Sequence, residues 1–158
     1  MKKLALFVCT GNICRSPIAE GLFREMARRA GIQDVEAASA GIGAGNGQPP
    51  SDHSVEVLAE EGIDISGQRS QMLTPELVEA ASHIFGMTTS HQQAIQAFFP
   101  EIQEKVFVLR ELIVDDALDL EVPDPGGAFC YLVRAANACG AGSWGSASND
   151  EERISACP

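Results

Sequence analysis

Residues 8–17, Val8-Cys9-Thr10-Gly11-Asn12-Ile13-Cys14-Arg15-Ser16-Pro17, decide how the chain folds. The apolar run Leu4–Val8 that leads into them is typical of a short buried strand. A helical pattern follows them, and the sequence predicts Ser16 as its N-cap with Pro17 at the first helical position. A loop between a strand and a helix N-terminus turns backbone N–H groups toward one small cup, which suits a phosphate-like dianion.

Cys9 and Arg15 are the two residues of this loop that point to chemistry. The positive end of the helix favours a thiolate at Cys9, and the planar guanidinium of Arg15 suits two phosphate oxygens. A thiolate attacks phosphorus while N–H groups and a guanidinium hold the oxygens. Ser16 has a second expected role, in which its hydroxyl donates to the Cys9 sulfur. The alternative is a buried structural cysteine before an ordinary turn; the flanking strand and helix favour the catalytic interpretation.

The segment from Cys9 to Glu20 resembles the signature of low-molecular-weight protein tyrosine phosphatases. The resemblance runs from about Lys3 to Pro125 and includes five further motifs: Ser39-Ala40-Gly41, Gly62-Ile63-Asp64, Met87-Thr88 with His91, Phe99-Pro100 and Asp124-Pro125. It implies a phosphate-binding loop formed by Thr10, Gly11, Asn12, Ile13, Cys14, Arg15 and Ser16. It also implies that Asn12, Ser16 and Ser39 support this loop.

The candidate general acid is Asp124, in the turn Val122-Pro123-Asp124-Pro125. A phosphate ester that leaves as an alkoxide or phenoxide needs a proton, which a carboxylic acid above the cup supplies. The flanking prolines stiffen the turn that holds Asp124. A plain surface turn is the alternative. The resemblance implies that Asp124 is the general acid and later the base that activates water.

The order of elements predicts an α/β fold. Four strands are expected, at Leu4–Val8, Val35–Ser39, His83–Met87 and Lys105–Leu109. Helices are expected at Pro17–Ala30 and Ser51–Glu61, after Thr74-Pro75, and after a capping box at Thr89–Gln92. Strands that alternate with helices favour a three-layer domain, in which a four-stranded parallel sheet carries helices on both faces and the phosphatase loop follows the first strand.

The 158 residues are expected to form one phosphatase-like domain, residues 1–139, with an atypical tail at 140–158. The run Gly140–Ser146 breaks any helical pattern. We interpret the tail as a diverged or frame-shifted segment that is partly disordered.

Composition and charge exclude several kinds of partner. The net charge of −11 argues against nucleic acid and anionic membranes. The apolar run after Met1-Lys2-Lys3 is too short for a signal peptide or a spanning helix, and a nucleophilic thiolate needs a reducing compartment, so a cytoplasmic protein is expected. His53, His83 and His91 lack metal-ligand spacing and are interpreted as structural or surface residues. No metal or organic cofactor is implied.

The function expected from this site is hydrolysis of phosphotyrosine in a phosphorylated protein substrate, through a phosphocysteine intermediate. The hydrocarbon side chain of Ile13 favours an aryl phosphate. The loop 41–50 lacks the aromatic residue that tyrosine-specific members usually carry, and Gly126-Gly127 follow the Asp-Pro, so a protein arginine phosphatase is an alternative. An arsenate reductase and an inactive phospho-residue binding module are two more. Cys14 is either a packed loop residue or a partner for Cys9 under oxidation.

Overall fold

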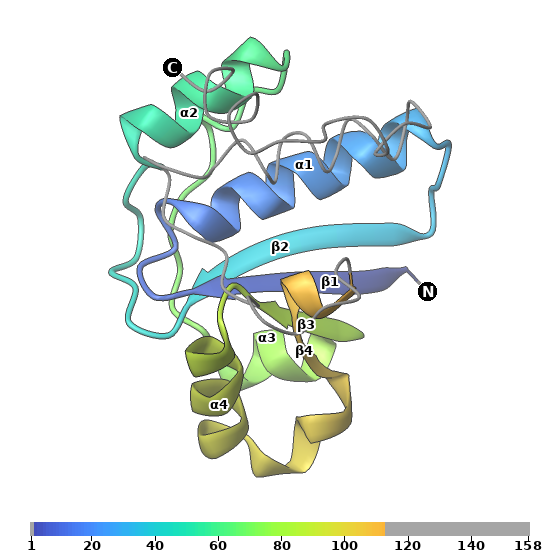
Figure 1. Cartoon of the computed structure of the whole chain (residues 1–158), viewed down its shortest axis with the longest axis vertical. Coiled ribbons are helices and arrows are strands. Elements are labelled where there is room, and N and C mark those ends of the chain that lie inside the picture. Colours follow the sequence, from blue (N-terminus) through green and yellow to red (C-terminus); the bar gives the residue numbers. More distant parts are fainter. Residues whose placement is uncertain (1, 113–158) are drawn as a thin grey trace, which may run out of the picture.

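The computed structural model describes residues 2–112. Its elements alternate between strands and helices in chain order (Figure 1). The strands are β1 Lys3–Cys9, β2 Val35–Gly41, β3 His83–Gly86 and β4 Val106–Val108. The α-helices are α1 Arg15–Arg29, α2 Asp52–Glu60, α3 Pro75–Ala80 and α4 Thr89–Phe98, and two 3₁₀-helices are η1 Pro100–Lys105 and η2 Leu109–Leu112.

The four strands form one parallel sheet in the order β2-β1-β3-β4. Val8 in β1 is paired with Ala40 in β2 and with Gly86 in β3. The carboxyl ends of these strands therefore lie at one edge of the sheet, where the chain leaves β1 for the loop 10–14. The predicted α/β fold with a four-stranded parallel sheet is confirmed.

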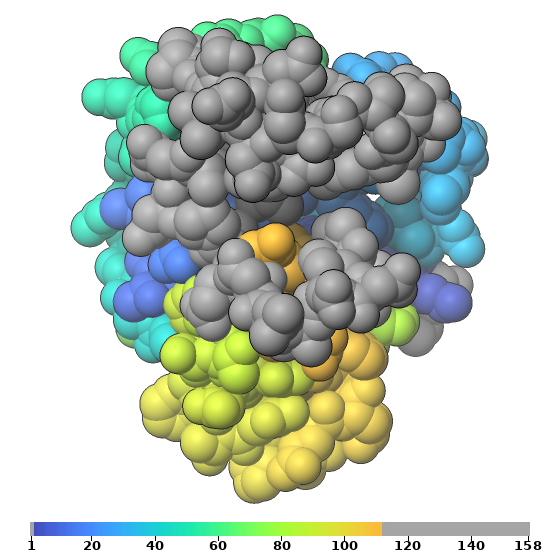
Figure 2. Space-filling model, in the orientation of Figure 1, coloured from blue at the N-terminus to red at the C-terminus, as the bar shows by residue number. Residues whose placement is uncertain are grey.

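Successive residues of β1 are buried on opposite faces of the sheet, as the period of two requires. Leu6 and Val8 belong to a core that includes Val78 of α3 and Ile95 of α4. Cys9 belongs to the core on the opposite face, together with Ala5 and Phe7 of β1 and Ala19 of α1. Helix α1 thus covers one face of the sheet, and α2 packs against α1 through a third cluster that includes Leu22 and Leu58. Helices α3 and α4 lie on the other face (Figure 1). In the space-filling view, α2 and α4 lie at opposite ends of the molecule (Figure 2).

Two predicted helix caps are wrong by one or two residues. Helix α1 begins at Arg15 with Cys14 as its N-cap, so Ser16 lies inside the first turn, where its hydroxyl contacts Asn12 instead of capping the helix. Helix α4 is capped by Thr88, whose side chain accepts the His91 N–H, rather than by Thr89. The earlier start of α1 brings Ser16 to the inner side of the loop.

Several predictions fall outside the described residues. These are the acid Asp124, the boundary between residues 139 and 140, and the tail 140–158. Across residues 2–112, no helix is long and apolar enough to cross a membrane.

Candidate active site

Cys9 is the last residue of β1, and its side chain is buried beneath the loop. The Cys9 sulfur accepts a hydrogen bond from the backbone N–H of Asn12 at 3.2 Å. The Ser16 hydroxyl oxygen lies 3.1 Å from the same sulfur. A thiolate accepts hydrogen bonds and cannot donate them, so with an ionised Cys9 this hydroxyl donates to sulfur. Two donors are therefore placed to stabilise negative charge on Cys9.

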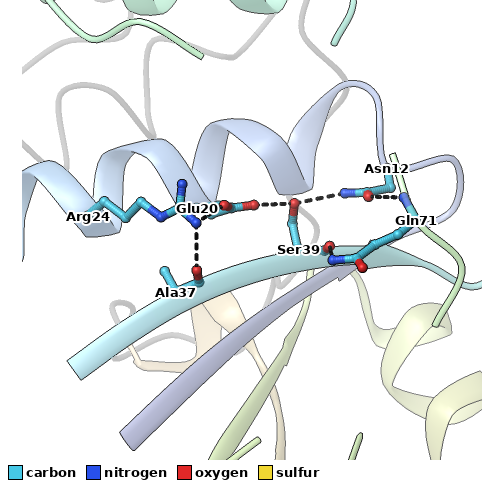
Figure 3. A network of polar contacts seen from close by, with 6 residues as sticks. All are labelled: Asn12, Glu20, Arg24, Ala37, Ser39 and Gln71. Carbon is cyan, nitrogen blue, oxygen red and sulfur yellow. Dashed lines mark hydrogen bonds and ion pairs between the residues drawn. The ribbon is translucent and has the colours of Figure 1, made fainter. Parts of the chain in front are cut away.

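Asn12 holds the loop in its shape. Its backbone has φ of 55°, the left-handed conformation that asparagine tolerates better than most residues. The buried amide Nδ2 donates to the hydroxyl of Ser16 at 2.9 Å. It also donates to the hydroxyl of Ser39 at 2.9 Å, and Oδ1 accepts the backbone N–H of Gln71 at 2.8 Å (Figure 3). Because the Gln71 N–H can only donate, it fixes which end of the Asn12 amide faces the two serines.

Three loop carbonyls face outward, toward the segment 41–51. They accept backbone hydrogen bonds that join Cys9 to Ile42, Thr10 to Gly43, and Ile13 to Ser51. In a planar trans peptide the N–H points opposite to the C=O. The next N–H groups, those of Thr10, Gly11 and Cys14, therefore point away from segment 41–51. This arrangement of donors is suited to an oxyanion.

Gly41 allows the end of β2 to approach the loop closely. A Cβ atom at this position would lie 2.5 Å from the Thr10 carbonyl oxygen and 3.0 Å from the Asn12 backbone nitrogen. Both neighbours are backbone atoms of the loop, so they cannot move aside without changing its shape. Glycine at the end of β2 is thus a requirement of the loop geometry.

The structure brings together nine of the ten predicted site residues. Arg15 is the first residue of α1, and its side chain is half-buried, as are those of Ile13 and Cys14. Thr10, Gly11, Asn12 and Ser16 complete the loop around Cys9, and Ser39 supports it from β2. The tenth, Asp124, lies outside the described residues.

His91 of α4 contacts the loop, a contact that was not predicted from the sequence. Its Nε2 lies 3.0 Å from the Thr10 hydroxyl, and its Nδ1 lies 2.8 Å from the Thr88 hydroxyl. The side chain is buried, so the structural role is correct and the surface alternative is wrong. The signal in the sequence was the inclusion of His91 among the motifs of the resemblance.

Glu20 and Arg24 form a second group that sequence reasoning missed. Glu20 is buried in α1 and accepts the Ser39 hydroxyl at 2.5 Å, while Arg24 contacts its other carboxylate oxygen at 2.6 Å (Figure 3). Burial raises the pKa of Glu20, and the Ser39 hydrogen bond and the Arg24 charge lower it in part. Arg24 also donates to the Ala37 carbonyl at 3.0 Å. The buried carboxylate is thereby linked to Asn12 through one hydroxyl.

Metal binding finds no support in the part of the chain that the structure describes. Residues 2–112 contain no group of three or more histidine, cysteine, aspartate or glutamate side chains arranged to hold a metal ion.

Comparisons with known proteins identify the family of this chain. The family model described as low molecular weight phosphotyrosine protein phosphatase matches residues 5–133. The match continues beyond Pro125, where the sequence resemblance was expected to end. The probable low molecular weight protein-tyrosine-phosphatase EpsP of Ralstonia nicotianae is 44% identical over 119 residues, which cover 75% of this chain and 79% of that protein.

A protein-arginine-phosphatase of Bacillus subtilis is 40% identical over 126 residues, covering 80% of this chain and 83% of that protein. Among solved structures, the low molecular weight protein tyrosine phosphatase from T. tengcongensis has a TM-score of 0.74 at 38% identity, covering 89% of this chain and 94% of that one. The chain therefore belongs to the low molecular weight phosphotyrosine protein phosphatase family, and it is a phosphatase.

Proposed function

We propose that this protein hydrolyses phosphotyrosine in protein substrates by transferring the phosphoryl group to Cys9. The Cys9 thiolate attacks phosphorus, a P–S bond forms, and the P–O bond to the tyrosine oxygen breaks. Asp124 donates a proton to that oxygen as it leaves. Asp124 then takes a proton from water, which attacks phosphorus and releases inorganic phosphate and the Cys9 thiolate.

The observation that carries this proposal is the pair of donors at the Cys9 sulfur. The Asn12 N–H and the Ser16 hydroxyl, at 3.2 and 3.1 Å, stabilise a thiolate at the end of β1. The same donors stabilise sulfur as the leaving group when water attacks the phosphocysteine. Arg15 and the N–H groups of the loop hold the phosphoryl oxygens.

Ile13 favours an aryl phosphate over a phosphorylated guanidinium. Its half-buried hydrocarbon side chain belongs to the loop itself and offers apolar contact to a phenyl ring. It has no hydroxyl with which to orient a water molecule. The family model, which is named for phosphotyrosine, agrees with this preference.

A protein arginine phosphatase is the second candidate, because two relatives carry that name. These relatives, from Geobacillus stearothermophilus and Bacillus subtilis, are 38% and 40% identical to this chain. Within segment 41–50, Ala44 is buried and Ile42 packs partly against the core, so this wall of the site has no aromatic face. Such a wall offers no ring to stack on a phenyl group, which supports a non-aromatic substrate.

The test is a comparison of kcat/KM for an aryl phosphate and for a phosphoarginine peptide across pH, with Asp124→Ala alongside. We expect the aryl phosphate to be the better substrate. We also expect Asp124→Ala to lose about 10²- to 10⁴-fold in rate on a poor leaving group, the usual worth of general acid catalysis.

Each other result replaces part of the proposal. Preference for phosphoarginine would move the protein to the second candidate. Unchanged turnover in Asp124→Ala would remove that residue from the mechanism. Binding of inorganic phosphate without hydrolysis of either substrate would indicate a phospho-residue binding module.

A further inference from the structure

We propose that Arg24 is a positioning residue of the catalytic loop, acting through the buried carboxylate of Glu20 and the hydroxyl of Ser39. This inference rests on the proposed function, because it concerns the same loop. It assigns a role in catalysis to a side chain of α1 that lies outside the Cys9–Glu20 signature.

A series of hydrogen bonds, through Ser39 and Asn12, connects Glu20 to the Cys9 sulfur. Gln71 fixes the Asn12 amide so that Nδ2 donates to both serine hydroxyls. Each hydroxyl then has its own hydrogen to donate elsewhere. The Ser39 hydrogen goes to the Glu20 carboxylate at 2.5 Å. Asn12 is thereby held from β2, while its backbone N–H reaches the Cys9 sulfur at 3.2 Å.

The charge of Glu20 strengthens this chain. A carboxylate polarises the Ser39 hydroxyl and makes its oxygen a better acceptor for the Asn12 amide. A neutral carboxylic acid does not do so, and an ionised one without a counter-charge adds negative potential near a site that must hold a thiolate and a phosphate. Glu20 therefore serves the loop best when it is ionised and paired.

Arg24 supplies the positive charge that pairs with the Glu20 carboxylate. One of its nitrogens lies 2.6 Å from Glu20 Oε1, one helical turn earlier, and donates to the Ala37 carbonyl in β2 at 3.0 Å. The second contact ties the guanidinium to the strand that carries Ser39. Arg24 thus holds α1 and β2 together at the point where the carboxylate meets the serine (Figure 3).

The other charged groups near Glu20 are engaged elsewhere or oppose it. An open pocket of about 570 Å³ lies beside Glu20 and Arg24. Its other charged lining residues are Glu25 and Arg28 of α1, and Asp64 and Arg69 of the loop after α2. Arg28 binds Glu25 at 2.7 Å, and Arg69 donates to backbone carbonyls of residues 66 and 68. The facing residues of β2, Ala38 and Ser39, carry no charge.

The experiment compares Arg24→Gln with Arg28→Gln, which removes an exposed arginine from the same helix. We expect kcat/KM for an aryl phosphate to fall about fivefold in Arg24→Gln, chiefly through kcat, as one charge-assisted hydrogen bond weakens. Arg24→Lys should recover most of the loss, and Arg28→Gln should match the wild type. Mass spectrometry of the Cys9 peptide gives the rate of its alkylation by iodoacetamide at each pH. We expect the pH profile of this rate to move to higher pH in Arg24→Gln and to stay unchanged in Arg28→Gln.

A double-mutant cycle tests the route through Glu20. If Arg24 acts through the carboxylate, Arg24→Gln has no further effect on kcat/KM in a Glu20→Gln background. Additive losses, or equal activity and equal alkylation profiles in Arg24→Gln and the wild type, would overturn the inference while leaving the phosphatase intact. An inactive wild type would instead overturn the proposed function.

Discussion

At the scale of single residues, the active loop depends on polar side chains that are buried and fully engaged. Asn12 bonds to two serines and one backbone N–H, and the resulting network ends at a carboxylate that burial makes harder to ionise. Such a group is retained at a cost to folding, which is typical of residues that serve a site. Stability and activity should therefore respond in opposite directions at Glu20.

Glu20→Gln tests this opposition. The pKa of Glu20 is raised above its ordinary value of 4.5, chiefly by burial. The folded state therefore binds the proton more tightly than the unfolded state, so this group's contribution to stability is full below that value and is lost as pH rises through the folded pKa. We expect the difference in free energy of unfolding, Glu20→Gln minus wild type, to increase from pH 5 to pH 8. We expect the activity of the variant to be lower than that of the wild type.

Urea unfolding of both proteins at several pH values measures this difference, since contributions from other groups cancel. A constant difference across the range would show that Glu20 has an unperturbed carboxyl in the folded protein.

At the scale of elements, the N-cap of α4 also contacts the active loop through His91. Thr88 accepts the His91 N–H at the start of α4 and contacts the His91 ring at 2.8 Å. That ring in turn reaches the Thr10 hydroxyl at 3.0 Å. Thr74 caps α3 in the same way, accepting the Leu77 N–H at 3.4 Å, and this hydrogen bond stays within α3.

Thr88→Val keeps the shape of the side chain and removes its oxygen. We expect a loss of about 1 kcal/mol in unfolding free energy from the missing cap. We also expect a lower kcat/KM, because the contact between the Thr88 hydroxyl and His91 Nδ1, which helps to orient the ring, is lost. Thr74→Val should lose similar stability in urea and keep its activity. Equal activities in the two variants would contradict a link from α4 to the loop.

Sequence patterns predicted the strands and most helices because each depends on local periodicity. The caps were harder, because several hydroxyls near each helix start can serve, and the choice depends on other partners. The Ser16 hydroxyl accepts a hydrogen bond from Asn12, and Cys14 is the N-cap of α1. The contacts of His91 with Thr10, 81 positions apart, and of Glu20 with Ser39 depend on which elements become neighbours. Periodicity carries no information about such pairs.

At the scale of the whole molecule, the parallel sheet gathers the site at one edge. Loops that follow β1, β2 and β3 meet there, so Cys9, Ser39 and His91 come from three separate regions of the chain. Segment 41–51 closes the outside of the loop through backbone hydrogen bonds. The residues at this edge surround the sulfur of Cys9, which contacts Asn12 and Ser16. Cys9 is the residue on which the proposed chemistry depends.

The most direct measurement is a rapid acid quench after mixing the enzyme with an aryl phosphate, followed by peptide mass spectrometry. In Asp124→Ala, where water is activated slowly and a good leaving group still departs, we predict that one phosphoryl group accumulates on the Cys9 peptide. Cys9→Ser should bind phosphate and turn over no substrate. Phosphoryl transfer to another residue, or continued turnover in Cys9→Ser, would contradict the assignment of Cys9 as the nucleophile.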